Sequence, residues 1–135
     1  MNTNIRWKQR FQNFEKAYNT LWRILDIQNP NEAEKMGLIQ AFEIVFELSW
    51  KTIKDYLFEL GFDEKSPRET LKQAFQNEII ADGHIWMEAL EKRNETVHTY
   101  DEEIAQLVEQ KIRENYAPML RELYFYLKKA YDDSK

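Results

Sequence analysis

The sequence lacks cysteine altogether and has only two histidines and three glycines among its 135 residues. Without cysteine there can be no disulfide, thiolate nucleophile or cysteine-ligated metal, and such a composition is typical of a reducing cytoplasm. His84 and His98 are too few to build a histidine zinc site, so we expect no metal. Because Gly37, Gly61 and Gly83 are widely separated, no glycine-rich loop can cradle a phosphate chain. P-loop and dinucleotide-binding folds are thereby excluded, and we expect no cofactor.

An excess of positive charge is also missing. The chain has 24 acidic and 19 basic residues and a net charge of -5, so its overall field does not attract nucleic acid or an anionic membrane. Any nucleic-acid role therefore needs a local site. No apolar run approaches the roughly 20 residues that span a bilayer, and the first residues form no signal-peptide core. We expect a cytoplasmic protein without a membrane partner.

What the chain does have is enough apolar surface for one core. Its composition is 43% apolar and 14% aromatic, over a length typical of a single domain, so we treat residues 1–135 as one domain. Glycine and proline are scarce, whereas strong helix formers are abundant. These features predict an all-α fold, specifically an antiparallel up-down four-helix bundle with an additional short helix.

Hydrophobic spacing and capping residues place these helices. An aromatic stripe at steps of four and three predicts a helix over residues 4–26, and a second helix should follow Asn29-Pro30-Asn31 and end at Gly61. Ser66-Pro67-Arg68-Glu69 is a capping box that opens a short helix ending near Asn77. A further helix should run from about Asp82 to near His98.

The last helix is expected to begin at a second capping box, Thr99 to Glu102. Its apolar stripe starts with Ile104 and Leu107 and continues to Leu127. Pro118 lies inside this pattern and removes one backbone hydrogen bond, which should kink or split the helix near Tyr116.

The most unusual local sequence runs from Glu91 to Tyr100. Arg93 continues the apolar spacing of its helix and so takes a core-facing position. Its planar guanidinium suits a phosphate, and the imidazole of His98 can exchange a proton near neutral pH. Cleavage of an RNA phosphodiester without a metal requires these two roles. One chain supplies a single such histidine, so a complete acid and base pair would most simply come from two subunits across a two-fold axis.

A purely structural interpretation also fits these residues. Arg93 could form a buried ion pair with Glu43 or Glu47, and His98 could stabilise a helix C-terminus. In that case the protein is a structural helical bundle, and Tyr100 simply continues the packed seam.

The same residues resemble a known family. Arg93-Asn94, followed by His98, one residue and Tyr100, is similar to the motif of the helical HEPN superfamily. Three further segments, residues 47–57, 66–71 and 82–86, together with 98–103, resemble its nucleotidyltransferase substrate-binding branch.

This resemblance implies a homodimer that works beside a separately encoded minimal nucleotidyltransferase. The chain itself lacks the Gly-Ser dipeptide and the paired-aspartate strand of such transferases. By resemblance, the pair forms a toxin–antitoxin system in which the helical protein is a ribonuclease toxin, and adenylylation of Tyr100 by the transferase silences it. Arg93 and His98 would then be catalytic, and Asn94 and Lys92 would bind the nucleotide or RNA substrate. A dimer cleft could add Lys51 or Lys54.

Overall fold

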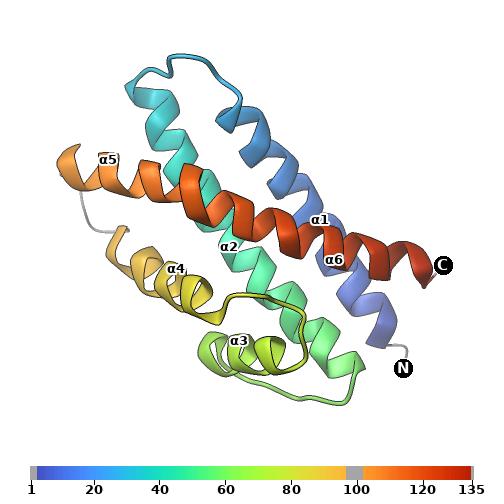
Figure 1. Ribbon diagram of the computed structural model, residues 1–135. Coiled ribbons are helices and arrows are strands. Elements are labelled where there is room, and N and C mark those ends of the chain that lie inside the picture. Colours follow the sequence, from blue (N-terminus) through green and yellow to red (C-terminus); the bar gives the residue numbers. More distant parts are fainter. Residues whose placement is uncertain (1–2, 97–101, 135) are drawn as a thin grey trace.

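The computed structural model is an all-helical bundle in the part of the chain that it describes (Figure 1). It describes the backbone of residues 3–96 and 102–134, and the side chains of residues 5–93 and 102–134. The elements are α1 (Thr3–Leu25), α2 (Glu32–Glu59), α3 (Pro67–Gln76), α4 (Gly83–Thr96), α5 (Glu102–Lys111), a π-helical turn (Ile112–Tyr116) and α6 (Ala117–Asp133).

The predicted helix ends are confirmed by their caps. Asn31 caps α2 with its side-chain oxygen on the Glu34 amide at 2.8 Å, and the Glu34 carboxylate accepts from the Asn31 amide in return. Ser66 caps α3 through the Glu69 amide at 3.2 Å. Gly61 has a φ of 100°, the left-handed conformation expected directly after a helix end.

Pro118 splits the last long helix, as its position predicts. The backbone N–H of Ala117 donates to the carbonyl of Ile112, five residues earlier, which is the π-helical hydrogen bond. Proline has no N–H to donate, and its ring crowds the carbonyl four residues before it, so the wider turn accommodates it. The outcome is α5, a π-helical turn, and α6 that begins with Pro118 in its first turn.

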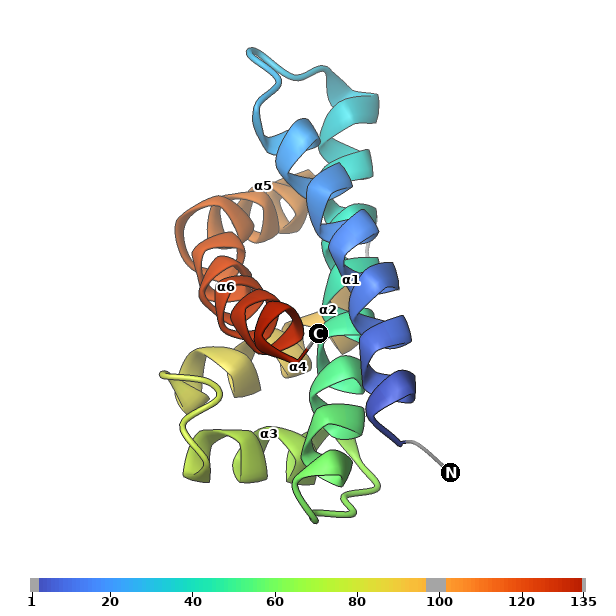
Figure 2. The ribbon, with the colours of Figure 1, turned by 90° about the vertical axis from the view of Figure 1, so that its right-hand side faces the viewer.

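The core lies between the α1–α2 pair and the remaining helices. Figure 2 shows α1 and α2 side by side along one side of the molecule, with α5, α6 and α3 on the other. The predicted aromatic stripe of α1 is buried, from Trp7 and Phe11 to Phe14 and Leu21. Tyr18 stacks on Tyr124 of α6 with ring centroids 4.3 Å apart. Aromatic packing therefore joins α6 to the α1–α2 pair.

Two positions of the predicted α5 stripe are not in the core. Ile104 is 43% exposed and Leu107 is 63% exposed, whereas Val108 and Ile112 farther along the same helix are buried. The spacing correctly identified the inner side of the helix from Val108 onward. At its first turns, however, α5 extends past the core, and these two side chains border a groove described below.

Candidate functional site

Phe46 of α2 sets the position of α4. Its ring lies 5.7 Å from the ring of Trp86, which is 2% exposed, and the guanidinium carbon of Arg93 lies 5.8 Å from the same ring. Trp86 and Arg93 are seven residues apart, so they occupy the same side of α4 two turns from each other. The predicted core-facing position of Arg93 is thus confirmed: its side chain is 20% exposed at the edge of the core.

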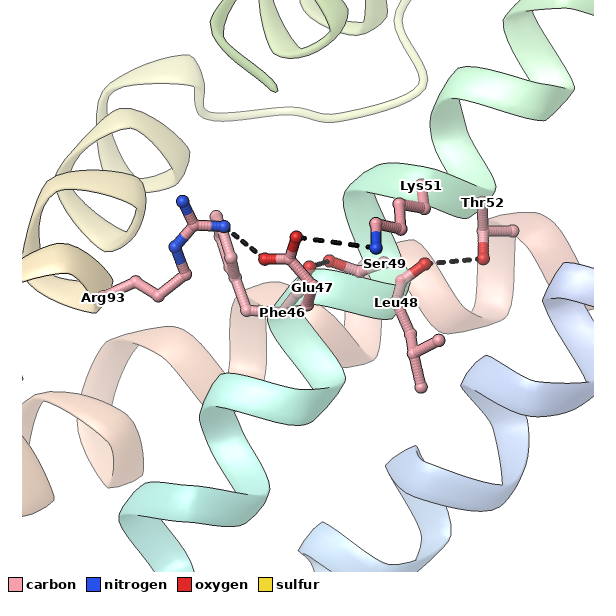
Figure 3. A network of polar contacts seen from close by, with 7 residues as sticks. All are labelled: Phe46, Glu47, Leu48, Ser49, Lys51, Thr52 and Arg93. Atoms are coloured by element: carbon pink, nitrogen blue, oxygen red, sulfur yellow. Dashed lines mark hydrogen bonds and ion pairs between the residues drawn. The ribbon is translucent and has the colours of Figure 1, made fainter. Parts of the chain in front are cut away.

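Glu47, next to Phe46, forms an ion pair with this arginine. Oxygen Oε2 of Glu47 accepts from Nη1 of Arg93, and Oε1 lies 3.8 Å from Nζ of Lys51, one turn farther along α2 (Figure 3). The side chains of Glu47 and Lys51 are each 39% exposed. The three residues form a chain of cation, anion and cation at the surface between α2 and α4.

The neighbouring hydroxyl groups of α2 are satisfied within the helix itself. Ser49 donates to the carbonyl of Phe46, and Thr52 to that of Leu48, each at 2.7 Å. Both residues are fully buried, so these bonds allow the polar side chains to face the core without an unpaired hydroxyl. Because their groups bond within the helix, they do not take part in the chain of charges formed by Arg93, Glu47 and Lys51.

A groove of about 470 Å³ lies between Lys92 of α4 and side chains of α5 and the π-helical turn. Its lining comprises Lys92, Ile104, Leu107, Val108, Gln110, Lys111, Glu114, Asn115 and Tyr116. Ile104 and Leu107 make its border apolar, and Lys92 and Lys111 bring positive charge to it. Lys92, predicted to bind substrate, therefore lines a groove directly beside the helix position of Arg93.

A second carboxylate joins α4 to two residues that line this groove, Lys111 and Tyr116. Glu88 of α4 accepts a hydrogen bond from the hydroxyl of Tyr116 at 2.7 Å, and Nζ of Lys111 lies 3.1 Å from the same oxygen. The Tyr116 hydrogen bond, followed by that of Lys111, lowers the pKa of Glu88 below its ordinary value. Glu88 consequently stays ionised in mildly acidic solution and ties α4 to the π-helical turn.

The structure brings only some of the predicted site residues together. Arg93 and Lys92 lie at the C-terminal part of α4, and Asn94 follows them within the same helix. His98 and Tyr100 lie outside the described residues, so their predicted roles stay predictions. Sequence reasoning missed the cluster of Glu88, Lys111 and Tyr116. The four-residue spacing of Glu88 and Lys92 places both on one face of α4, but it gives no sign of the partners Lys111 and Tyr116.

The described side chains offer guanidinium and ammonium groups at the surface. No group of three or more histidine or acidic side chains within residues 5–93 and 102–134 could hold a metal ion. Guanidinium and ammonium groups at the surface suit a phosphate, which accepts several hydrogen bonds at once. No helix in the described part of the chain combines the length and the apolar character needed to span a bilayer.

Comparison with known proteins finds helical relatives of the same kind. A crystal structure of a Thermus thermophilus protein has a TM-score of 0.75 at 29% identity, with 82% of this chain and 94% of that one covered. A Haemophilus influenzae structure, described as the fold of a substrate binding domain of a nucleotidyltransferase, has a TM-score of 0.67 at 26% identity, with 94% and 99% covered.

A curated relative and a family model agree with this likeness. Over 77 residues the chain is 36% identical to a Haemophilus influenzae protein named "Probable ribonuclease HepT". That match covers 53% of either protein, so the chain spans about half the length of this relative. The model of the family "Nucleotidyltransferase substrate binding protein like" matches residues 9–129, nearly the whole bundle including Arg93 and its partners. The chain belongs to the nucleotidyltransferase substrate-binding-protein-like family.

Proposed function

We propose that this chain is the helical partner subunit of a separately encoded minimal nucleotidyltransferase and binds nucleotide or RNA around Arg93. Family membership over residues 9–129 supports the partnership. The observation that carries the binding role is the partly exposed guanidinium of Arg93, which shares the carboxylate of Glu47 with the ammonium group of Lys51. In a chain with a net charge of -5, this is a local cationic site of the kind that an RNA backbone needs.

In this proposal two subunits form a homodimer whose cleft contains Lys92, Arg93, Asn94 and His98 from each chain. A dimer brings two copies of each group to one phosphodiester, which supplies the second proton-transferring group that a single chain lacks. The pair with the transferase acts in the cytoplasm as a toxin–antitoxin system, with this subunit as the toxin.

Affinity purification of the tagged chain from its source cell tests the partnership. We expect a small nucleotidyltransferase to co-purify in a fixed ratio, and light scattering of the isolated chain to give a dimer mass. A chain that co-purifies with no nucleotidyltransferase would contradict the proposed partnership, and a monomer mass would contradict the shared cleft.

A second candidate function is metal-independent endoribonuclease activity. It is favoured by the relative named "Probable ribonuclease HepT" and by the spacing of Arg93 and His98. His98 would transfer the proton of the 2′-hydroxyl or of the leaving oxygen, and Arg93 would stabilise charge developing on the phosphate. Adenylylation of Tyr100 would silence the enzyme by placing a charged nucleotide in the site.

Cleavage of RNA by the purified chain in EDTA tests this second function. Intact mass is measured first, so that the protein assayed carries no adenylyl group on Tyr100. We expect cleavage by the wild type and none by folded Arg93→Ala and His98→Ala variants. A wild type that cleaves none of a varied set of RNAs would leave the substrate-binding subunit as the function to pursue.

A further inference from the structure

Glu47 holds Arg93 in one orientation. Its carboxylate pairs with Nη1 of Arg93, and the ring of Phe46 lies beside the guanidinium carbon at 5.8 Å. A guanidinium carries its N–H donors in a rigid planar fork. A hydrogen bond from Nη1 to a carboxylate, with an aromatic ring beside the guanidinium carbon, therefore restricts the directions of the other N–H bonds.

The same carboxylate also connects Arg93 to Lys51. Oε1 of Glu47 lies 3.8 Å from Nζ of Lys51, so one negative group lies between two positive groups (Figure 3). The three side chains carry a net charge of +1 and stay 20–39% exposed. A phosphate backbone that follows this surface meets two cations whose separation Glu47 sets.

The exposure of Glu47 argues against a role confined to stability. Ion pairs with solvent-accessible partners contribute little to stability, because water competes for both charges. Glu47 is 39% exposed, and water can therefore hydrate its carboxylate when the arginine is absent. The pair changes the free energy of unfolding little, but it determines where the guanidinium points.

We propose that Glu47 is a positioning residue, which orients Arg93 and Lys51 so that both contact the phosphate backbone of single-stranded RNA. This inference rests on the proposed function, since it concerns the same site around Arg93. The opposite role for Glu47 is also physically simple: a carboxylate beside the two cations could compete with the phosphate and weaken binding.

The two roles differ in the sign of one measurable effect. Removing a negative charge near a polyanion strengthens its binding when the charge only competes. Removing a positioning group weakens binding even though the site becomes more positive, because the guanidinium no longer meets the phosphate in a fixed orientation. Electrostatic attraction alone thus predicts tighter binding, and positioning predicts weaker binding.

The experiment measures binding of a fluorescent, fully 2′-O-methylated single-stranded RNA, which lacks the hydroxyl needed for self-cleavage. Dissociation constants are determined at several salt concentrations for the wild type, Glu47→Ala, Glu47→Gln and Lys51→Gln. Glu122→Ala and Glu122→Gln are matched controls, because Glu122 is an exposed carboxylate on α6. Circular dichroism and thermal melting establish that each variant is folded.

We expect Glu47→Ala to bind about tenfold more weakly than the wild type, and Glu122→Ala to bind within about twofold of it. Glu47→Gln should recover part of the loss, since its amide oxygen still accepts from Arg93, but it should bind more weakly than Glu122→Gln. Lys51→Gln should reduce the slope of log K against log salt by about 0.7.

Each other outcome has a definite meaning. A wild type that binds no RNA at low salt would overturn RNA binding and this inference with it. Wild-type binding that is matched or exceeded by Glu47→Ala would overturn the positioning role alone and make Glu47 a competitor of the phosphate. If Glu47→Ala does not fold, Glu47→Gln is compared with Glu122→Gln instead. Equal or tighter RNA binding by Glu47→Gln would then overturn the positioning role.

Discussion

Two arginines reach α2 from different helices, and their ion pairs are built in opposite ways. Arg10 of α1 donates from Nε to Asp55 at 2.8 Å, and there the carboxylate is 5% exposed while the arginine is 43% exposed. In the Arg93–Glu47 pair the arginine is the more enclosed partner at 20%, and the carboxylate is 39% exposed. The first pair neutralises a buried charge, whereas the second orients a cation at a surface that a ligand can reach.

The largest effect on stability is expected when the Arg10–Asp55 pair is broken. Arg10→Ala leaves the carboxylate of Asp55 buried without its cation, so we expect a loss of about 2–3 kcal/mol in the free energy of unfolding. Chemical denaturation measures it. RNA binding by the folded variant should be unchanged, and a loss below about 0.5 kcal/mol would contradict the contrast between the two pairs.

Arg93→Ala should have the opposite effects to Arg10→Ala: a small loss of stability and a large loss of RNA binding. The carboxylate it leaves behind is already hydrated, and so the free energy of unfolding should fall by about 1 kcal/mol at most. Binding of the 2′-O-methylated RNA should weaken about tenfold or more, because a charge-assisted contact is lost. A loss of several kcal/mol in stability would instead support the purely structural interpretation of this residue.

Glu88 is an intermediate case: its side chain is 40% exposed, and it has one cationic partner, Lys111, and one neutral hydrogen-bond donor, Tyr116. Tyr116→Phe removes the phenol that donates to it at 2.7 Å. Because water can replace part of this bond, we expect a loss of about 1 kcal/mol, measured by chemical denaturation. Tyr126→Phe on α6 is a matched control at a 38% exposed tyrosine, and it should cost less.

The smallest expected effect is on the acid titration of the same carboxylate. Its folded-state pKa lies below the ordinary value of 4.5, so its contribution to stability is complete above that value. The contribution is lost as the pH falls through the folded pKa. In Tyr116→Phe the pKa of Glu88, followed by NMR of its side-chain carboxyl carbon, should rise toward 4.5. An unchanged pKa would show that Lys111 and Lys92 account for the lowering without the phenol.

Most of the fold could be predicted from local sequence because its signals are local. The caps at Asn31 and Ser66, the end at Gly61 and the split before Pro118 each depend on residues within one turn of one another. Exposure at Ile104 could not be predicted in this way. Helical spacing identifies the more apolar side of α5, but how far the core extends along it depends on the packing of distant helices.

The candidate site, too, could be predicted only where its signals are local in the sequence. The spacing from Trp86 indicated that Arg93 faces the core, and Glu47 was one of two carboxylates expected to pair with it. The pairing of Arg93 with Glu47 depends on the relative rotation of α2 and α4, which the contacts of Phe46 fix only in three dimensions. The Tyr116–Glu88 bond depends on the π-helical turn, whose exact register is set by packing and not by the proline alone.

That π-helical turn makes the rotation of α6 sensitive to the count of residues before it. Each residue of an α-helix turns the chain by about 100°, so one residue more or less upstream redirects every side chain downstream. Deleting a single residue between 112 and 116 would close the wide turn and bring the ring of Pro118 against the carbonyl four residues before it. Inserting one would swing Leu120 and Leu123, now buried, toward water. The length of this segment is therefore constrained more tightly than its composition, and relatives that keep Pro118 and the α6 core should tolerate substitutions here far better than a change in the number of residues.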